Sequence, residues 1–347
     1  MSSRPVSAGR APGPRTRLPT IRDVATRAGV SAATVSRTLN NFPVVAPPTR
    51  ARVERAVDEL SYRRSSAARN LSLGRTNAIG VVAPFFTTPS VVERLRGVVE
   101  RLAGRNYDLL LFDVESPRQR DEAVHDFARR GRVDGLLVIS LPLSEPVIEA
   151  LRRDGVPLVL VDLPHATLPH LAIDNVLGGE LATEHLLARG ARRIGFVGDS
   201  PAGAFDFTSS EHRRRGYERA LRRAGIEALP ELQVRGPHGR ESARALAERL
   251  LARAGPPAAV FAASDIQAVG VLEAARALHL RVPDDLAVIG FDDIELAAIV
   301  GLTTVRQPLY ASGAAGVDLL LAQIETHDSG PEARELAPLA VIERRTA

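Results

Sequence analysis

The sequence of 347 residues has no cysteine, no tryptophan and no lysine, so every basic residue other than histidine is arginine. The absence of cysteine excludes disulfide bonds and thiolate catalysis. No run of about 18 apolar residues occurs, so we expect no membrane span. The N-terminus lacks the apolar core of a signal peptide, and we therefore expect a cytoplasmic protein.

Sequence signs of catalysis are missing as well. The eight histidines do not have the spacing of metal ligands. Neither the G-x-S-x-G pattern of serine hydrolases nor the phosphate-binding G-x-x-x-x-G-K-[ST] pattern is found. We therefore expect no catalytic residue, no bound metal and no cofactor, and we do not expect an enzyme.

The net charge of +4 is distributed unevenly. Residues 1–74 contain 13 arginines and four acidic residues, which leaves 32 basic and 37 acidic residues for the remainder. A basic N-terminal part on a mildly acidic body predicts that one end binds a polyanion such as nucleic acid. The alternative is a solvated basic tail, but the excess of arginine persists when residues 1–19 are left out.

The first 75 residues divide into three segments. Residues 1–19 are rich in Arg, Pro, Ser, Gly and Ala, which predicts a disordered basic arm. Residues 20–64 have helical periodicity and predict a compact unit of three short helices. Residues 65–75 are polar, small and basic, and we expect a linker there.

Within 20–64, two short helices flank Gly29, with Asp23 completing a capping-box variant at the start of the first and Ser31 starting the second. This spacing is typical of a helix-turn-helix whose second helix enters the major groove. The solvent side of the second helix carries short residues and one arginine, namely Ala32, Ala33, Thr34, Ser36 and Arg37. Arg37 can pair with a guanine edge or a phosphate. The alternative is an ordinary helical hairpin with a surface arginine.

From Asn77 onward the pattern changes to an α/β protein. Short runs rich in β-branched residues, such as AIGVVAP, VDGLLVIS and LAVIGFD, alternate with amphipathic segments such as VVERLRGVVERLAGRN. This order predicts parallel sheets with helices on both faces. One large sheet and two stacked subdomains both fit the periodicity of residues 76–347.

Residues 20–40 read TIRDVATRAGVSAATVSRTLN and contain every fixed letter of the pattern T-x-x-D-V-A-x-x-A-G-V-S-x-x-T-V-S-R-x-L-N. The chain therefore resembles the lac-repressor/galactose-repressor (LacI/GalR) family of transcriptional regulators. The resemblance continues through NAIGVV, VDGLLV, SDIQAVG, VPDDLAVIGFDD and LTTVRQP. It implies a periplasmic-binding-protein-like core of two Rossmann-like subdomains, about 77–175 plus 307–325 and 176–306 plus 326–347. It also implies a ligand in the cleft, at the carboxyl ends of the strands.

The resemblance further implies a hinge within residues 65–75. In this family the hinge becomes helical when two copies pair on DNA, and a leucine at the position of Leu71 enters the minor groove. With the five residues on the solvent side of the second helix, it places Thr20, Ser31, Asn40, Arg69 and Leu71 among the expected DNA contacts. The alternative for Leu71 is a linker residue that packs on the core. The recognition positions after Ser31 are both alanine, so we expect readout to depend more on Thr34, Arg37, the arm and the hinge.

For the effector, the resemblance matches Arg213 to a ligand-contacting arginine of the R-x-x-G-Y motif and Asp265 to a residue that bonds ligand hydroxyls. Asp292 follows the strand LAVIGF and is expected at the cleft. The alternative for all three is a capping or salt-bridging role. Four phenyl rings can cover the apolar face of a sugar or serve as packing residues, namely Phe85, Phe86, Phe205 and Phe207.

Together these features predict a homodimeric, nucleoid-associated transcription regulator, expected to be a repressor. We expect it to bind a near-palindromic operator with an affinity set by a small effector, expected to be a carbohydrate. One alternative is a ligand-binding or transport protein, against which the helix-turn-helix and the missing export signal count. The other is a sugar-processing enzyme, against which the missing catalytic constellation counts.

Overall fold

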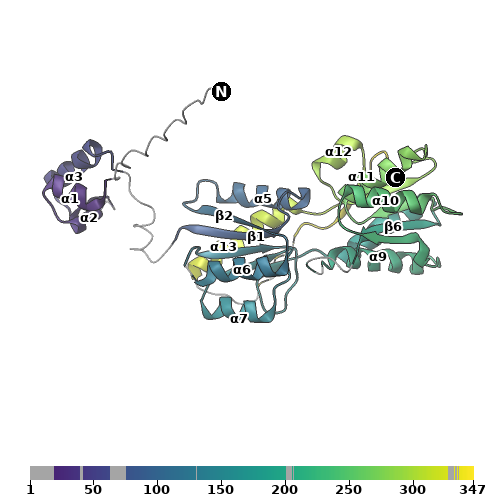
Figure 1. Ribbon diagram of the computed structural model, residues 1–347, viewed down its shortest axis with the longest axis horizontal. Coiled ribbons are helices and arrows are strands. Elements are labelled where there is room, and N and C mark those ends of the chain that lie inside the picture. The colour runs from purple at the N-terminus through teal and green to yellow at the C-terminus, as the bar shows by residue number, and fades with distance from the viewer. Residues whose placement is uncertain are drawn as a thin grey trace, which may run out of the picture. The chain divides into compact units, whose positions relative to one another are not determined.

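The computed structural model describes residues 19–39, 42–62, 76–129, 131–200, 205, 207–326, 332, 334 and 336–347 (Figure 1). The chain forms two compact units, Met1–Arg75 and Thr76–Ala347. None of the helices in the described ranges combines the length and the hydropathy that a membrane crossing requires.

The first unit contains helices α1 (Ile21–Ala28), α2 (Ala32–Leu39) and α3 (Pro47–Glu59). The carboxylate of Asp23 accepts hydrogen bonds from the backbone and the hydroxyl of Thr20, both at 2.7 Å, which fixes the start of α1. Gly29, with φ of +63°, ends that helix in the left-handed conformation. The core of the unit is small and is centred on one valine from each helix, Val24, Val35 and Val53. The three short helices confirm the compact helical unit that the periodicity of residues 20–64 predicts.

The second unit contains two separate sheets, which decides between the arrangements that the periodicity left open. The first sheet is parallel, in the order β2-β1-β3-β4-β5. Its strands are β1 (Ala78–Pro84), β2 (Asp108–Val114), β3 (Gly135–Ile139), β4 (Leu158–Val161) and β5 (His170–Leu171). Helices α5 (Pro89–Leu102) and α13 (Leu309–Thr326) cover one face, and α6 (Pro117–Arg129) and α7 (Glu145–Arg153) cover the other.

The second sheet has the order β11-β10-β9-β8-β6-β7 and is parallel except for β11, which pairs antiparallel with β10. Its strands are β6 (Ile194–Asp199), β7 (Gln233–Gly236), β8 (Ala259–Ala262), β9 (Ala287–Asp292), β10 (Thr303–Arg306) and β11 (Ala340–Ile342). Helices α8 (Asn175–Ala188) and α9 (Ser209–Arg223) cover one face. Helices α10 (Arg240–Leu251) and α11 (Asp265–Ala277) cover the other, and the short α12 (Glu295–Val300) follows β9.

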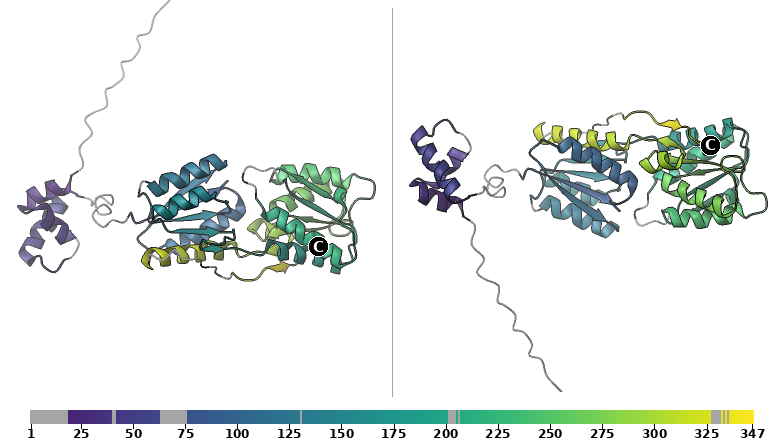
Figure 2. Two further views of the ribbon diagram at one scale, coloured as in Figure 1. Left: turned by 90° about the horizontal axis from the view of Figure 1, so that it is seen from below. Right: turned by 90° about the horizontal axis from the view of Figure 1, so that it is seen from above.

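The chain passes repeatedly between the two subdomains. It leaves the first between β5 and α8, and it returns between β10 and α13. Both views of Figure 2 show α13, in yellow, lying along the first sheet although it follows the second sheet in sequence. Because the strands within each sheet are nearly all parallel, their carboxyl ends gather polar residues at one edge.

Candidate functional site

A cavity of about 130 Å³ lies between the two subdomains of the second unit. Residues that follow β1, β3 and β4, together with α5, form its first wall, and ends of β6, β8 and β9, together with α9, form its second wall. The first wall includes Pro84, Phe85, Ser90, Val91, Arg94, Ser140 and Asp162. The second wall includes Asp199, Phe207, Ser209, Arg213, His238, Ala263, Ser264 and Asp292, and Gln307 comes from the return connection.

Four residues of this cavity have positive φ angles although none of them is glycine. Phe85 (+44°), Ser140 (+53°) and Asp162 (+70°) each directly follow a strand of the first sheet, and Asp292 (+122°) ends β9. Such conformations cost on the order of 1–3 kcal/mol each and concentrate at functional sites. The strain therefore marks the same edge that the cavity occupies.

The first wall is built around the carboxylate of Asp162. Nη2 of Arg94 lies 2.9 Å from Asp162 Oδ1, and the hydroxyl of Ser140 donates to Oδ2 at 2.7 Å. The side chains of Arg94 and Asp162 are largely buried. A buried carboxylate with a cation on one oxygen and a hydroxyl on the other is held in one orientation.

The second wall is built around Arg213, which is buried on α9. Its Nε donates to Asn175 Oδ1 at 2.8 Å and its Nη1 to the carbonyl of Ala263 at 2.6 Å. Nη1 also lies 3.7 Å from Asp292 Oδ1. Burial raises the pKa of Asp292, although the charge of Arg213 and the hydrogen bond from Gln307 act in the opposite direction.

The cavity wall contains a third pair of a basic and an acidic side chain, in addition to Arg94–Asp162 and Arg213–Asp292. Nδ1 of His238 lies 3.0 Å from Asp199 Oδ1, which also accepts a hydrogen bond from Nε2 of Gln267 at 2.8 Å. Burial lowers the pKa of His238, but the hydrogen bond to Asp199 and the charge of that carboxylate outweigh burial, so the pKa is raised above its usual value.

The cavity therefore combines carboxylates, which accept hydrogen bonds, with guanidinium groups, which donate them. A ligand with several hydroxyl groups can satisfy both kinds of partner, because a hydroxyl both donates and accepts. Phe85 and Phe207 supply apolar faces in the same cavity. This mixture is typical of sites for small polar ligands that also have an apolar face.

The structure brings together four of the seven residues that the sequence suggested for the effector, namely Phe85, Phe207, Arg213 and Asp292. Phe205 is buried behind them, with its ring 6.0 Å from that of Phe85 and 5.4 Å from that of Phe207. Phe86 is exposed and lines an open groove along α5 instead. Phe205 thus matches the packing alternative.

Asp265 begins α11 and does not lie in a loop, and it is not among the residues that line the cavity. Its side chain is fully buried, and it accepts hydrogen bonds from the hydroxyl of Thr304 at 2.5 Å and from the backbone of Ile294 at 3.0 Å. Burial, together with the charge of Asp292, raises its pKa well above the usual carboxyl range. This placement matches the structural alternative for Asp265.

Several residues that line the cavity were not among the effector contacts expected from the sequence. Ser140, Asp162 and Asp199 follow or end an apolar strand, so the rule that suggested Asp292 would also have found them. Arg94 and Gln307 carry no such signal, because they lie inside a helix and in a connection, and they are 213 residues apart.

On the first unit, the helix α2 presents the residues expected to read DNA. Ser31 caps α2, since its hydroxyl accepts a hydrogen bond from the backbone of Thr34 at 3.1 Å. Val35 and Thr38 face the core, whereas Ala33 and Arg37 are exposed. Ala32, Thr34 and Ser36 are partly exposed, and Thr20 caps α1. Asn40, Arg69 and Leu71 lie outside the described residues.

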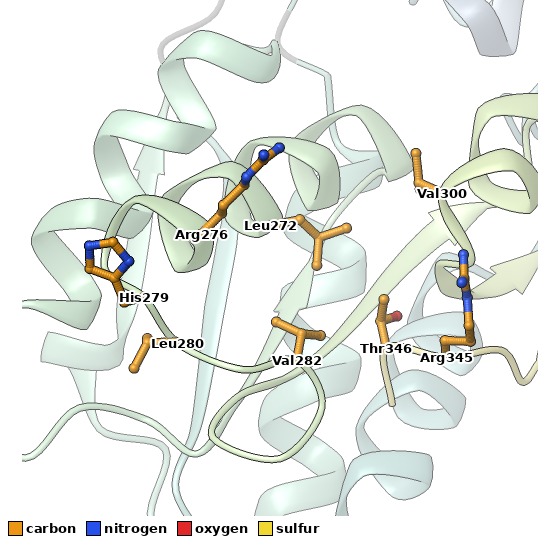
Figure 3. Close-up of a pocket in the computed structure, with 8 residues that line it drawn as sticks. All are labelled: Leu272, Arg276, His279, Leu280, Val282, Val300, Arg345 and Thr346. Atoms are coloured by element: carbon orange, nitrogen blue, oxygen red, sulfur yellow. The ribbon is translucent and has the colours of Figure 1, made fainter.

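A second, wider cavity of about 570 Å³ lies on the outer part of the second subdomain (Figure 3). The C-terminal part of α11 and the following loop form one side, and Val300, Arg345 and Thr346 form the other. The hydroxyl of Thr346 is already engaged with Val288 and Thr303. This cavity is not at the carboxyl edge of the sheet, where the strained and paired residues lie, so we place the candidate ligand site at the first cavity.

Comparison with known proteins identifies both units. A family model described as bacterial regulatory proteins, lacI family, matches residues 20–65, and a periplasmic binding protein-like domain matches residues 183–347. The ribose operon repressor of Escherichia coli (strain K12) is 36% identical over 335 residues, which cover 95% of this chain and 100% of that repressor. The chain belongs to the lacI family of bacterial regulatory proteins.

Solved structures also support the assignment of this chain to the lacI family. The lac repressor dimer bound to operator and the anti-inducer ONPF matches with a TM-score of 0.82 at 26% identity, over 95% of this chain and 99% of that one. The transcriptional regulator CelR in complex with cellobiose matches with a TM-score of 0.70 at 31% identity, over 95% and 100% of the two chains. The resemblance stated from the sequence is confirmed, and the lacI-family protein is a DNA-binding transcription regulator with a ligand-binding core.

Proposed function

We propose that this regulator is a repressor that binds a near-palindromic operator as a homodimer and that a small sugar in the cavity between the subdomains controls its affinity. The observation that carries the proposal is the cavity itself, where Asp162, Arg213 and Asp292 converge at strand ends beside Phe85 and Phe207. Related proteins support the ligand class, since one is named for a ribose operon and another is complexed with cellobiose.

The proposed DNA contacts are those of α2, above all the exposed Arg37, together with Thr20. They also include Asn40, Arg69 and Leu71, which lie outside the described residues. A related structure is a dimer bound to operator, which supports pairing of two copies on DNA. We propose no enzymatic activity, because the related proteins are transcriptional repressors. We also propose that the protein is located in the cytoplasm, associated with the nucleoid. A transport role would leave the helix-turn-helix unexplained.

Selection of bound sequences from random DNA by the full chain tests the operator part. We expect a palindrome with half-sites about one DNA turn apart. Binding should weaken steeply with salt, because arginines displace counterions from phosphates. A variant that lacks residues 1–75 should lose this binding, and specific binding by that variant would contradict the proposal.

Thermal-shift measurements against sugars, nucleosides and amino acids test the ligand part. We expect sugars to raise the unfolding temperature, since a ligand that binds only the folded state stabilises it by an amount that grows with the ratio of ligand concentration to Kd. Stabilisation by nucleosides or amino acids with no response to any sugar would contradict the proposed ligand class.

A further inference from the structure

Arg94 is an unusual component of the first wall, because it is a cation in a nearly closed environment. It lies on α5 with 3% of its surface exposed. Its Nη2 contacts two acceptors, Asp162 Oδ1 at 2.9 Å and the side-chain oxygen of Gln307 at 3.2 Å. One guanidinium thus joins a carboxylate of the first subdomain to the return connection.

Gln307 continues this contact into the second subdomain. It follows β10 and precedes α13, so it stands where the chain returns from one subdomain to the other. Its side-chain nitrogen donates to Asp292 Oδ1 at 2.5 Å, while its side-chain oxygen accepts from Arg94. The residue is 5% exposed. An amide suits this place, because it donates at one end and accepts at the other, whereas a carboxylate could only accept.

The resulting chain of contacts runs Asp162–Arg94–Gln307–Asp292, and we call it the relay. Both of its ends are carboxylates in the wall of the ligand cavity, one in each subdomain. The narrow space beside Arg94, Asp162 and Gln307 has no volume that a water molecule could occupy. On their other side all four residues of the relay line the ligand cavity, so a ligand that fills the cavity lies directly against the relay.

Asp162 and Asp292 lie in different subdomains, so a rotation that changes their separation also changes the span that the relay must bridge. A large enough rotation would interrupt the relay at one of the two bonds of Gln307. A ligand that bonds both carboxylates favours one of these arrangements, and a ligand changes DNA affinity only by favouring one state over another.

We propose that Arg94 and Gln307 are positioning residues that couple the ligand cavity to the arrangement of the two subdomains, and thereby to operator affinity. This inference rests on the proposed function, because it takes the cavity to be the effector site. Gln307 acts through Asp292 and Arg94 acts through Asp162.

The test compares the full chain with Gln307→Met, Arg94→Met and the double variant. The first readout is operator affinity without added ligand, by fluorescence anisotropy, with the active fraction determined by titration with excess operator. We expect each single variant to change this affinity about fivefold or more, in the same direction. The double variant should change it no further, because both substitutions interrupt one relay and residues that act together are non-additive.

Gln323→Met is the matched control. Gln323 is buried to a similar degree, on α13, and its side-chain nitrogen and oxygen have no hydrogen-bond partner among the described residues. We expect this control to leave operator affinity as in the unmodified chain. Should Arg94→Met fail to fold, Gln307→Glu becomes the second single variant and the double variant is omitted. Glutamate accepts from Arg94 but has no donor for Asp292 when ionised, so we expect it to change operator affinity in the same direction as Gln307→Met.

The second readout is the ratio of operator affinities with and without D-ribose. If neither D-ribose nor any sugar of the thermal-shift panel changes the affinity of the unmodified chain, the sugar proposal fails, and the ligand-free comparison still decides the relay. An operator affinity of Gln307→Met equal to that of the unmodified chain would overturn the relay. So would fully multiplicative effects in the double variant.

Discussion

The guanidinium carbon of Arg213 lies 3.7 Å from the centre of the Phe291 ring, and Nη1 of the same residue lies 3.7 Å from Asp292 Oδ1. The ring and the carboxylate come from adjacent positions of β9, so one strand end holds the arginine by two different kinds of contact. Asn175 accepts from Nε of this arginine, and the carbonyl of Ala263 accepts from Nη1. The arginine is thus oriented before any ligand arrives, which reduces the cost of binding.

Arg213→Met tests how far the fold depends on this arrangement. The substitution leaves Asp292 buried without its guanidinium, and breaking a buried ion pair costs about 3–5 kcal/mol. We expect urea unfolding of the full chain to show a loss of that order. Arg219→Met, on the same helix, is the control, because the ion pair of Arg219 with Glu180 has the same separation of 3.7 Å but the arginine is exposed to solvent. The control should lose less than about 1 kcal/mol. Equal losses in both variants would contradict this account of Arg213.

The raised pKa of Asp265 should make the free energy of unfolding depend on pH. Its pKa is raised in the folded chain by burial and by Asp292, so folding favours the protonated form. This stabilising contribution is present at low pH and is lost as the pH rises through the folded pKa. In Asp265→Asn it is missing at every pH. The free energy of unfolding of the unmodified chain, minus that of the variant, should therefore increase as the pH falls from neutral. A difference that stays constant with pH would contradict the raised pKa.

Arg37→Ala tests the exposed side of α2. If Arg37 makes a bidentate contact with a guanine, the substitution should weaken the free energy of operator binding by about 1–3 kcal/mol. The affinity for random DNA should then change little. If it contacts only a phosphate, both affinities should fall alike. Anisotropy titrations with the two DNAs distinguish these cases. An unchanged affinity for both DNAs would remove Arg37 from the interface.

The parts of the molecule that depend on local pattern could be predicted from the sequence. The capping of α1 by Thr20 and Asp23 and the buried valines of the first unit follow from spacing along one helix. Arg213 and Asp292 came from the family resemblance and from position at a strand end. All of these features are local or belong to a motif, so they could be predicted without knowledge of the packing.

The parts that depend on packing could not be predicted. Phe85 and Phe205 have the same chemistry, but the fold turns one ring toward the cavity and buries the other behind it. Asp265 was expected at the ligand, yet Thr304 and Ile294 occupy its oxygens. The contact between Arg94 and Gln307 joins a helix of the first subdomain to a connection far along the chain. No periodicity brings such residues together.

The most direct test of the central claim is the operator affinity of the full chain with and without sugars, measured for the unmodified protein and for Asp292→Asn. We expect at least one sugar to change the affinity of the unmodified protein about fivefold or more. In Asp292→Asn the ratio of the two affinities should fall toward one at the same sugar concentration, because a cavity carboxylate that accepts from the sugar hydroxyls is gone. An undiminished sugar response in that variant would show that the ligand binds elsewhere.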